Sequence, residues 1–155
     1  MKLLFVCSNN FIRSPFAEQR LRIEIAGDLS QPVEIASAGA FAGLLPRELS
    51  KRAIDEALVH GVDLSMHRTR STSPELLNGA DLILPMDEDS HWFVTEELRA
   101  HPDRDRRIRR FVSFISDLSL REIADPLIDG NSYDETYPLI VRGVIEIRRW
   151  LRTQR

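Results

Sequence analysis

Short apolar runs that alternate with helical patterns constrain the fold of this chain more than any other feature of its sequence. Four runs have the length and composition of buried strands, at residues 3–6, 33–36, 81–86 and 111–115. Segments with helical periodicity follow them, at residues 15–26, 50–60, 87–99 and 137–152. A strand–helix unit repeated four times is typical of a parallel sheet. We therefore predict an α/β fold in which a single domain, residues 1–155, holds a four-stranded parallel sheet with helices on both faces.

The composition indicates a globular protein and gives no reason to expect nucleic acid or a membrane as a partner. Of the 155 residues, 43% are hydrophobic, and a formal net charge of −3 gives no reason to expect nucleic acid as a partner. No apolar run approaches the roughly 20 residues of a membrane span, and the four apolar residues after Lys2 are too few for a signal peptide. A single cysteine excludes an internal disulfide and a cysteine-based zinc site. We expect a protein of the reducing cytoplasm without a membrane partner.

The only cysteine, Cys7, stands where the first predicted strand ends. Ligands of open parallel sheets bind at the carboxyl ends of the strands, and Ser37 follows the second predicted strand at the same edge. A helix is expected just beyond Cys7, with Ser14 as its N-cap and Pro15 at its first helical position. Cys7 therefore lies between a strand and a helix, at the edge where such folds bind ligands.

The residues after Cys7 fit a phosphate-binding loop that follows the first strand. The loop consists of Ser8, Asn9, Asn10, Phe11, Ile12 and Arg13. Backbone N–H groups in a tight loop of this length can converge on one oxyanion, and a helix N-terminus aims its own N–H groups at the same point. Arg13 adds a guanidinium that can hold two phosphate oxygens at once.

These surroundings would also act on the Cys7 sulfur. A thiol beside a helix N-terminus and a guanidinium is a thiolate at neutral pH, and a thiolate beneath a bound phosphate can attack phosphorus. The spacing of Cys7 and Arg13 alone is weak evidence in a chain with many arginines, but the preceding strand and the expected helix start strengthen it. The alternative is that Cys7 is a buried structural thiol.

Several separated segments resemble the low-molecular-weight protein tyrosine phosphatase family, in the family's order. They are residues 6–15 (VCSNNFIRSP), 37–39 (SAG), 62–68 (VDLSMHR), 81–87 (DLILPMD) and the Asp125-Pro126 pair. The likeness extends over nearly the whole chain. It implies the family's fold and its activity, the hydrolysis of phosphomonoesters and above all of phosphotyrosine, with neither a metal nor a cofactor.

The resemblance also implies roles for individual residues. Cys7 would be the nucleophile and Arg13 the phosphate clamp. Asp125 would be the general acid that protonates the leaving oxygen, and then the base that activates water against the phosphocysteine intermediate. Ser14 would hydrogen-bond the sulfur and ease its departure. For Asp125 the alternative is a plain turn residue, because Asp-Pro often begins a turn.

A second group of residues would support the loop rather than react. The resemblance implies that Asn10, Ser37 and His67 form a buried polar network that holds the loop in shape. For His67 this role agrees with the ordinary expectation for a buried histidine, which is a structural residue with satisfied hydrogen bonds.

The chain departs from the family's pattern at four positions. Asn9 replaces a glycine, and if that position has a positive φ, asparagine is the least costly substitute. Ile12 replaces a second cysteine that could protect Cys7 in a disulfide. Leu127 and Ile128 stand where many members carry aromatic residues that flank the phosphotyrosine ring. The candidates to replace that aromatic lip are Phe11, Phe41 and Trp92.

Two other functions are compatible with the sequence. An arsenate reductase of related fold could use an external small thiol, although a relay through the protein's own cysteines is impossible with only one. An inactive phosphate-binding module is favoured only by Asn9, and Cys7, Arg13 and Asp125 together oppose it. For a phosphatase, the substrate would be a protein with phosphotyrosine or a small aryl phosphate.

Overall fold

Three parallel strands form the sheet in the part of the chain that the structure describes. The computed structural model describes residues 1–27, 32–43, 46–116, 119–128 and 132–154. The strands are β1 (Lys2–Cys7), β2 (Glu34–Gly39) and β3 (Leu82–Pro85), in the order β2-β1-β3. The register pairs Cys7 with Gly39 and Val6 with Pro85, so the carboxyl ends of all three strands meet at one edge.

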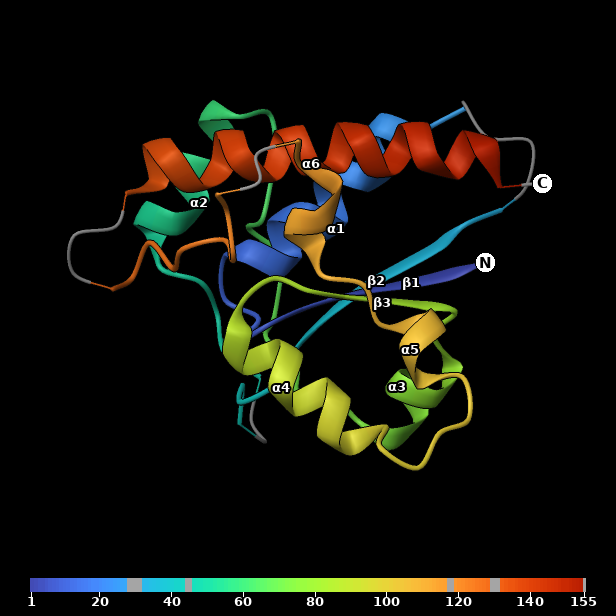
Figure 1. Cartoon of the computed structure of the whole chain (residues 1–155). Helices are drawn as coiled ribbons and strands as arrows, with labels where there is room; N and C mark the ends of the chain where they lie inside the picture. The colour runs from blue at the N-terminus through green and yellow to red at the C-terminus, as the bar shows by residue number, and fades with distance from the viewer. Residues whose placement is uncertain (28–31, 44–45, 117–118, 129–131, 155) are drawn as a thin grey trace.

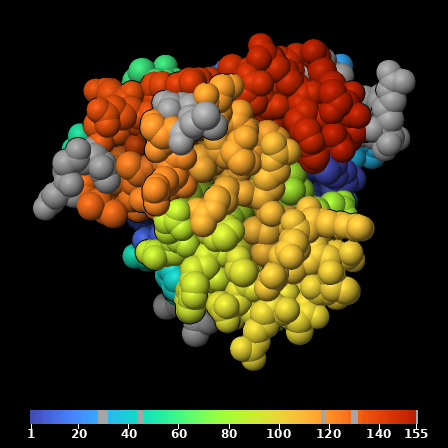
Figure 2. Space-filling view, in the orientation of Figure 1, coloured from blue at the N-terminus to red at the C-terminus, as the bar shows by residue number. Residues whose placement is uncertain are grey.

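Helices cover both faces of this sheet (Figure 1). On one face lie α1 (Arg13–Ile25), α2 (Lys51–Val59) and α6 (Tyr133–Thr153), and on the other lie α3 (Pro74–Gly79), α4 (Glu88–Glu97) and α5 (Arg104–Arg107). Figure 2 shows one side of the molecule, on which the segment that follows β3, yellow to orange, lies below α6. No helix within the described ranges is both long and apolar enough to cross a membrane.

Alternating side chains of β1 divide the core into two layers. Leu3, Phe5 and Cys7 belong to the hydrophobic cluster beneath α1 and α6, whereas Leu4 and Val6 belong to the cluster beneath α3 and α4. Successive residues of a strand point to opposite faces, so a strand that is covered on both sides is apolar throughout. The continuous apolar run at residues 3–6 follows from this arrangement.

The prediction of a fourth strand at residues 111–115 is wrong. The chain makes a single bridge between Ile108 and Ile83, and then turns into a 3₁₀ helix, η1 (Phe111–Phe114). Phe111 packs edge-on against Phe5 of β1, with ring centroids 6.1 Å apart. A short apolar run indicates that its residues are buried, but it does not distinguish a strand from a helical turn. Here the buried residues belong to a helical turn that packs beneath α6.

Two predicted helix starts are also corrected. Helix α1 begins at Arg13 after Ile12, so Ser14 is not its N-cap and its hydroxyl bonds other side chains instead. Helix α6 begins at Tyr133, four residues before the predicted start, because the Ser132 hydroxyl accepts the N–H of Asp134 and caps the helix. Residues 133–136 are therefore helical, although the apolar periodicity of the sequence indicates a helix only from Tyr137 onward.

Replacement of Gly143 by alanine should destabilise the protein. A Cβ atom at this position of α6 would lie 2.4 Å from the Phe111 ring, which is itself fully buried. Overpacking of this kind costs about 1–3 kcal/mol and outweighs the better helix propensity of alanine, which is worth about 1 kcal/mol. The free energy of unfolding in denaturant measures the effect. Gly79→Ala is the matched control, because no atom lies within 4 Å of its Cβ position; equal stability changes at the two sites would contradict the packing argument.

Candidate active site

The loop between β1 and α1 begins at Cys7, the last residue of β1. Cys7 is 2% exposed, and its sulfur lies 3.1 Å from the Ser14 hydroxyl at the start of α1. The segment after β2 fixes the beginning of the loop, because Ala40 N donates to Cys7 O at 2.9 Å and Phe41 N donates to Ser8 O at 2.7 Å. The strand end and the helix start therefore bring the thiol and the Ser14 hydroxyl together.

Asn10 is the centre of the hydrogen bonds that hold this loop. It is fully buried, and its Nδ2 donates to Ser14 Oγ at 3.0 Å and to Ser37 Oγ at 2.9 Å. Its Oδ1 accepts the backbone N–H of Arg70 at 3.0 Å, and its carbonyl oxygen lies 3.0 Å from His67 Nε2. The structure thus places Asn10, Ser37 and His67 in one network with Ser14.

The left-handed position of the loop is Asn10 rather than Asn9. Asn10 has a φ of 53°, and it is the only non-glycine residue with a positive φ in the described ranges. The expectation that Asn9 has this conformation is therefore wrong. Asparagine tolerates the left-handed region better than most residues, and the buried side-chain hydrogen bonds of Asn10 hold it there.

His67 is held in its neutral form. Burial lowers its pKa, and this effect outweighs the hydrogen bond to the Asn10 carbonyl, which raises it. A neutral ring whose Nε2 carries the proton can donate to that carbonyl without bringing a charge beneath the loop. The geometry therefore suits a supporting residue.

Arg13 lies between two carboxylates. Its guanidinium is buried and forms ion pairs with Asp87 at 2.7 Å and Asp125 at 2.9 Å, and it also donates to the carbonyl of Ile123 at 2.9 Å. Burial lowers the pKa of Arg13, but the negative groups around it, Cys7 first, raise it by more. The two carboxylates and the Ile123 carbonyl therefore hold the Arg13 guanidinium in place.

Asp87 combines two structural roles. Its Oδ1 accepts the N–H of Ser90 at 2.7 Å and caps α4, while its Oδ2 accepts the Ser8 hydroxyl at 2.8 Å and pairs with Arg13. Burial raises the pKa of Asp87, but the Arg13 charge and the hydrogen bonds from the two serines outweigh burial and hold the pKa below its usual range. One carboxylate thus ties α4, the loop and Arg13 together.

Asp125 begins a turn and also faces the loop. Its Oδ1 accepts the N–H of Leu127 at 3.0 Å, and its Oδ2 pairs with Arg13 at 2.9 Å. The side chains of Leu127 and Ile128, just beyond it, are exposed. One oxygen of Asp125 therefore stabilises the turn while the other contacts Arg13. A turn at Asp125-Pro126 is thus compatible with a role of Asp125 at the site.

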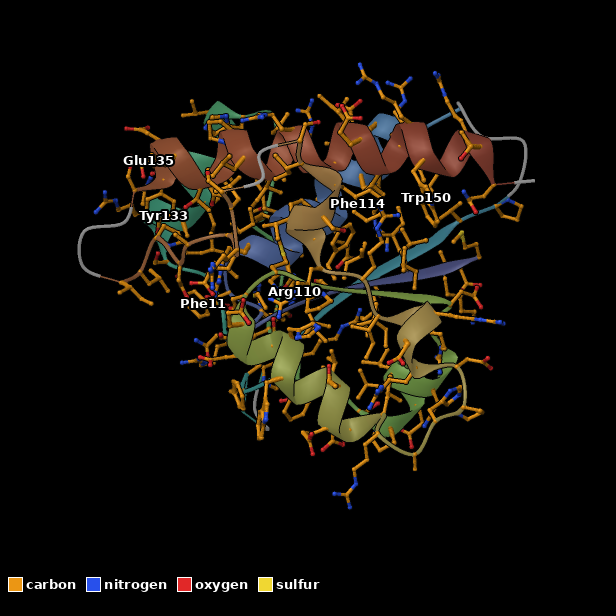
Figure 3. All side chains as sticks on the ribbon, in the orientation of Figure 1. Phe11, Arg110, Phe114, Tyr133, Glu135 and Trp150 are labelled. Carbon is orange, nitrogen blue, oxygen red and sulfur yellow. The ribbon has the colours of Figure 1, made fainter. Side chains whose placement is uncertain are left out.

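Phe11 is the aromatic residue that the loop itself provides. It lies where β1 ends (Figure 3), it packs partly against the core, and the Arg47 guanidinium stands 5.2 Å from the centre of its ring. Phe41 and Trp92, the other two candidates for an aromatic lip, are exposed, and Phe41 packs edge-on against Phe93 of α4.

Two carboxylates of the site are not identified as site residues from the sequence. The sequence places Asp87 at the start of a helix and at the end of segment 81–87, which carries part of the resemblance, but gives it no role at the site. Its position directly after β3, at the edge where Cys7 ends β1, is a usable signal for such a role. Glu18 is the second of these carboxylates, and no motif in the sequence singles it out. Its side chain is buried and accepts the hydroxyl of Ser37 at 2.6 Å. The described residues contain no group of three or more histidine, cysteine or acidic side chains placed to hold a metal ion.

Asn10 and Asn9 should respond differently to substitution. Asn10→Ala removes three side-chain hydrogen bonds and leaves alanine in the left-handed region, so we expect a loss of about 1–3 kcal/mol in stability and a large loss of affinity for inorganic phosphate. Asn10→Gly restores the backbone freedom alone and should recover little of the affinity. Asn9→Gly should leave phosphate affinity within a few-fold. Titration with phosphate measures all three, and an effect of Asn9→Gly as large as that of Asn10→Ala would contradict this assignment.

Comparisons with known proteins connect this geometry to a family. The profile of the family described as low molecular weight phosphotyrosine protein phosphatase matches residues 2–154. The low molecular weight protein-tyrosine-phosphatase Etp of Escherichia coli (strain K12) is 37% identical over 142 residues, which cover 91% of this chain and 88% of Etp. A protein-arginine-phosphatase of Bacillus subtilis (strain 168) is 28% identical over 86% of this chain and 83% of that protein. The structure of the tyrosine phosphatase AmsI of Erwinia amylovora matches with a TM-score of 0.76 at 26% identity, over 96% of this chain and 91% of that one.

Proposed function

Because this chain belongs to the low molecular weight phosphotyrosine protein phosphatase family, we propose that it hydrolyses protein phosphotyrosine through a phosphocysteine intermediate on Cys7. The observation that carries the proposal is the position of the Cys7 sulfur. It lies at the carboxyl edge of the sheet, 3.1 Å from the Ser14 hydroxyl, in a loop that begins with a thiol and ends with a buried guanidinium. A thiolate in that position is a nucleophile with a phosphate clamp beside it.

In the first step, the loop N–H groups and Arg13 hold the phosphate dianion of the substrate. The Cys7 thiolate attacks phosphorus, so that an S–P bond forms while the P–O bond to the phenol breaks. Asp125 gives its proton to the leaving oxygen. In the free protein Asp125 is paired with Arg13; a bound phosphate competes for the same guanidinium, and the released carboxylate takes up from water the proton that it then gives to the leaving oxygen.

In the second step, a water molecule attacks the phosphocysteine. Asp125, now ionised, removes a proton from the water, the S–P bond breaks, and inorganic phosphate leaves. The Ser14 hydroxyl donates a hydrogen bond to the departing Cys7 sulfur and stabilises the thiolate. Asp87 keeps the Arg13 fork in place throughout, because it pairs with Arg13 at 2.7 Å while its other oxygen caps α4.

The residues at the mouth of the site support an aryl phosphate rather than a phosphoarginine. Phe11 offers an aromatic face, and Leu127 and Ile128 are exposed apolar side chains beyond Asp125. The Arg47 guanidinium stands over the Phe11 ring and brings a positive charge to the same place. A phosphoarginine leaves as a guanidinium, which this charge opposes, whereas a phenol is neutral and packs on apolar surface. A free thiol as nucleophile also suits a reducing compartment such as the cytoplasm.

A side-by-side assay of the purified chain tests the proposal. The substrates are a phosphotyrosine peptide, a phosphoarginine peptide, a phosphoserine peptide, and arsenate with glutathione as the external thiol. We expect kcat/KM to be highest for phosphotyrosine. A higher kcat/KM for phosphoarginine would overturn the substrate assignment, and arsenate reduction without phosphate release from any peptide would overturn the phosphatase assignment as a whole.

A further inference from the structure

Arg47 places a positive charge at the mouth of the candidate active site. Its guanidinium stands 5.2 Å from the centre of the ring of Phe11, which belongs to the loop between β1 and α1 and is labelled in Figure 3. Arg47 is exposed, and a guanidinium that rests on an aromatic face still has N–H donors for another partner. The proposed mechanism assigns no partner to these donors.

The backbone of Arg47 is fixed by a neighbouring segment of the chain. Arg47 N donates to Thr69 Oγ1 at 2.9 Å, and Thr69 N donates to the Arg47 carbonyl at 3.0 Å. Thr69 is buried, and the adjacent residues Glu48 and Arg68 form an antiparallel bridge. The Arg47 side chain therefore starts from a fixed point beside the loop, and less conformational freedom is lost when it binds a partner.

No carboxylate in the described part of the chain forms an ion pair with Arg47. The neighbouring acid, Glu48, pairs with Arg68 at 2.8 Å instead. Arg52 provides a contrast: it also lies over an aromatic ring, that of Tyr133, but Glu56 lies 4.0 Å from it. The charge of Arg47 is therefore available to an anion that approaches the mouth of the site.

We propose that Arg47 is a specificity-determining residue, which binds the carboxylate of an aspartate or glutamate next to the phosphotyrosine of the substrate protein. The inference rests on the proposed function, in which the loop holds the phosphate and Phe11 offers a face to the phosphotyrosine ring. The peptide backbone then stays at the mouth of the site, with the neighbouring Cα atoms about 3.8 Å to either side. A carboxylate on such a neighbour can accept two hydrogen bonds from one guanidinium.

The alternative is that Arg47 only packs on Phe11. Because that contact lies within the protein, its loss would change the hydrolysis of all phosphotyrosine peptides by the same factor. A contact with a substrate carboxylate instead favours acidic peptides alone, and it acts on KM rather than kcat because the carboxylate is remote from the reacting atoms. An exposed ion pair changes affinity by up to about fivefold, and salt weakens it.

Two phosphotyrosine peptides that differ only in the residues on either side of the phosphotyrosine, aspartate in one and asparagine in the other, test the inference. For the wild-type chain at low salt we expect kcat/KM to be about two- to fivefold higher for the aspartate peptide, mainly through a lower KM. Arg47→Met keeps an apolar side chain on Phe11 but removes the charge, so the ratio should fall to about one. Arg47→Lys keeps the charge and should retain a preference for the aspartate peptide.

Arg52→Gln is the matched control, because it removes the same charge from an arginine that also lies over an aromatic ring, but over a ring of α6 instead of the loop. Its ratio should stay at the wild-type value. Equal kcat/KM for the two peptides in the wild-type chain would overturn the inference. Equal falls of the ratio in Arg47→Met and Arg52→Gln would also overturn it, since the preference would then come from the general charge of the surface.

Binding to the Cys7→Ser chain tests the same preference without turnover. Fluorescence anisotropy of the two labelled peptides should show about two- to fivefold tighter binding of the aspartate peptide, and the added Arg47→Met substitution should remove the difference. Equal binding of the two peptides, or binding of neither, would overturn the inference. A wild-type chain that hydrolyses neither peptide would instead overturn the proposed function, because binding is measured independently of hydrolysis.

Discussion

Cys7→Ser should abolish turnover of phosphotyrosine while phosphate and vanadate still bind. A serine hydroxyl is not ionised at neutral pH, so the nucleophile is lost, but the loop N–H groups and the Arg13 guanidinium are unchanged. We expect hydrolysis to fall to the detection limit in a steady-state assay. The affinity for vanadate, measured by isothermal titration calorimetry, should stay within a few-fold of the wild-type value.

The fold of the variant provides the control. Cys7 is buried at the end of β1, and serine is close in size, so the free energy of unfolding should change little relative to the loss of activity. A Cys7→Ser chain that retains a substantial fraction of wild-type kcat would show that another residue attacks phosphorus. In that case Cys7 would be the buried structural thiol that its low exposure also allows.

Asp125→Asn should slow the hydrolysis of substrates with poor leaving groups by roughly 10²–10⁴-fold, the usual contribution of general acid–base catalysis. Asparagine keeps the oxygen that accepts the Leu127 N–H, so the turn is preserved. The decrease in rate therefore measures the loss of proton transfer to the leaving oxygen. Aryl phosphates whose phenols are strongly acidic leave without protonation and should be slowed far less. Measurement of kcat over a series of aryl phosphates of increasing phenol pKa tests the difference.

Asp87→Asn is the matched comparison for Asp125→Asn. Both carboxylates pair with Arg13, at 2.7 and 2.9 Å, but only Asp125 is assigned to the leaving group. Loss of the Asp87 charge should weaken the hold on Arg13 and reduce kcat/KM by the same factor for good and poor leaving groups. Identical leaving-group dependence in the two variants would show that Asp125 acts only through Arg13.

The segment from Cys7 to Arg13 is readable from the sequence because its geometry is local. An apolar run that ends at a thiol, followed by a short loop and a helix, places the sulfur at the carboxyl edge of a parallel sheet without any knowledge of distant contacts. The structure has Cys7 as the last residue of β1 and Arg13 as the first residue of α1. The prediction that Ser14 is the N-cap of this helix is nevertheless wrong. Its hydroxyl forms hydrogen bonds with Cys7 and Asn10 of the loop instead.

The carboxylates of the site depend on contacts that local patterns do not encode. Asp87 looks like a helix cap, and one of its oxygens does cap α4; the other pairs with Arg13, which is 74 residues away along the chain. Glu18 lies beyond the first turn of α1, and only the packed structure brings its carboxylate to the Ser37 hydroxyl. The missing fourth strand has the same cause, because the run at residues 111–115 fits a strand and a buried helical turn equally well.

Identification of the phosphorylated residue during turnover tests the central claim most directly. The chain is mixed with a phosphotyrosine peptide, denatured within milliseconds, digested and analysed by mass spectrometry. We predict a transient phosphate on Cys7, which decays as inorganic phosphate appears and which forms more slowly in Asp125→Asn. Phosphate on any other residue, or hydrolysis without a phosphorylated Cys7, would contradict the mechanism.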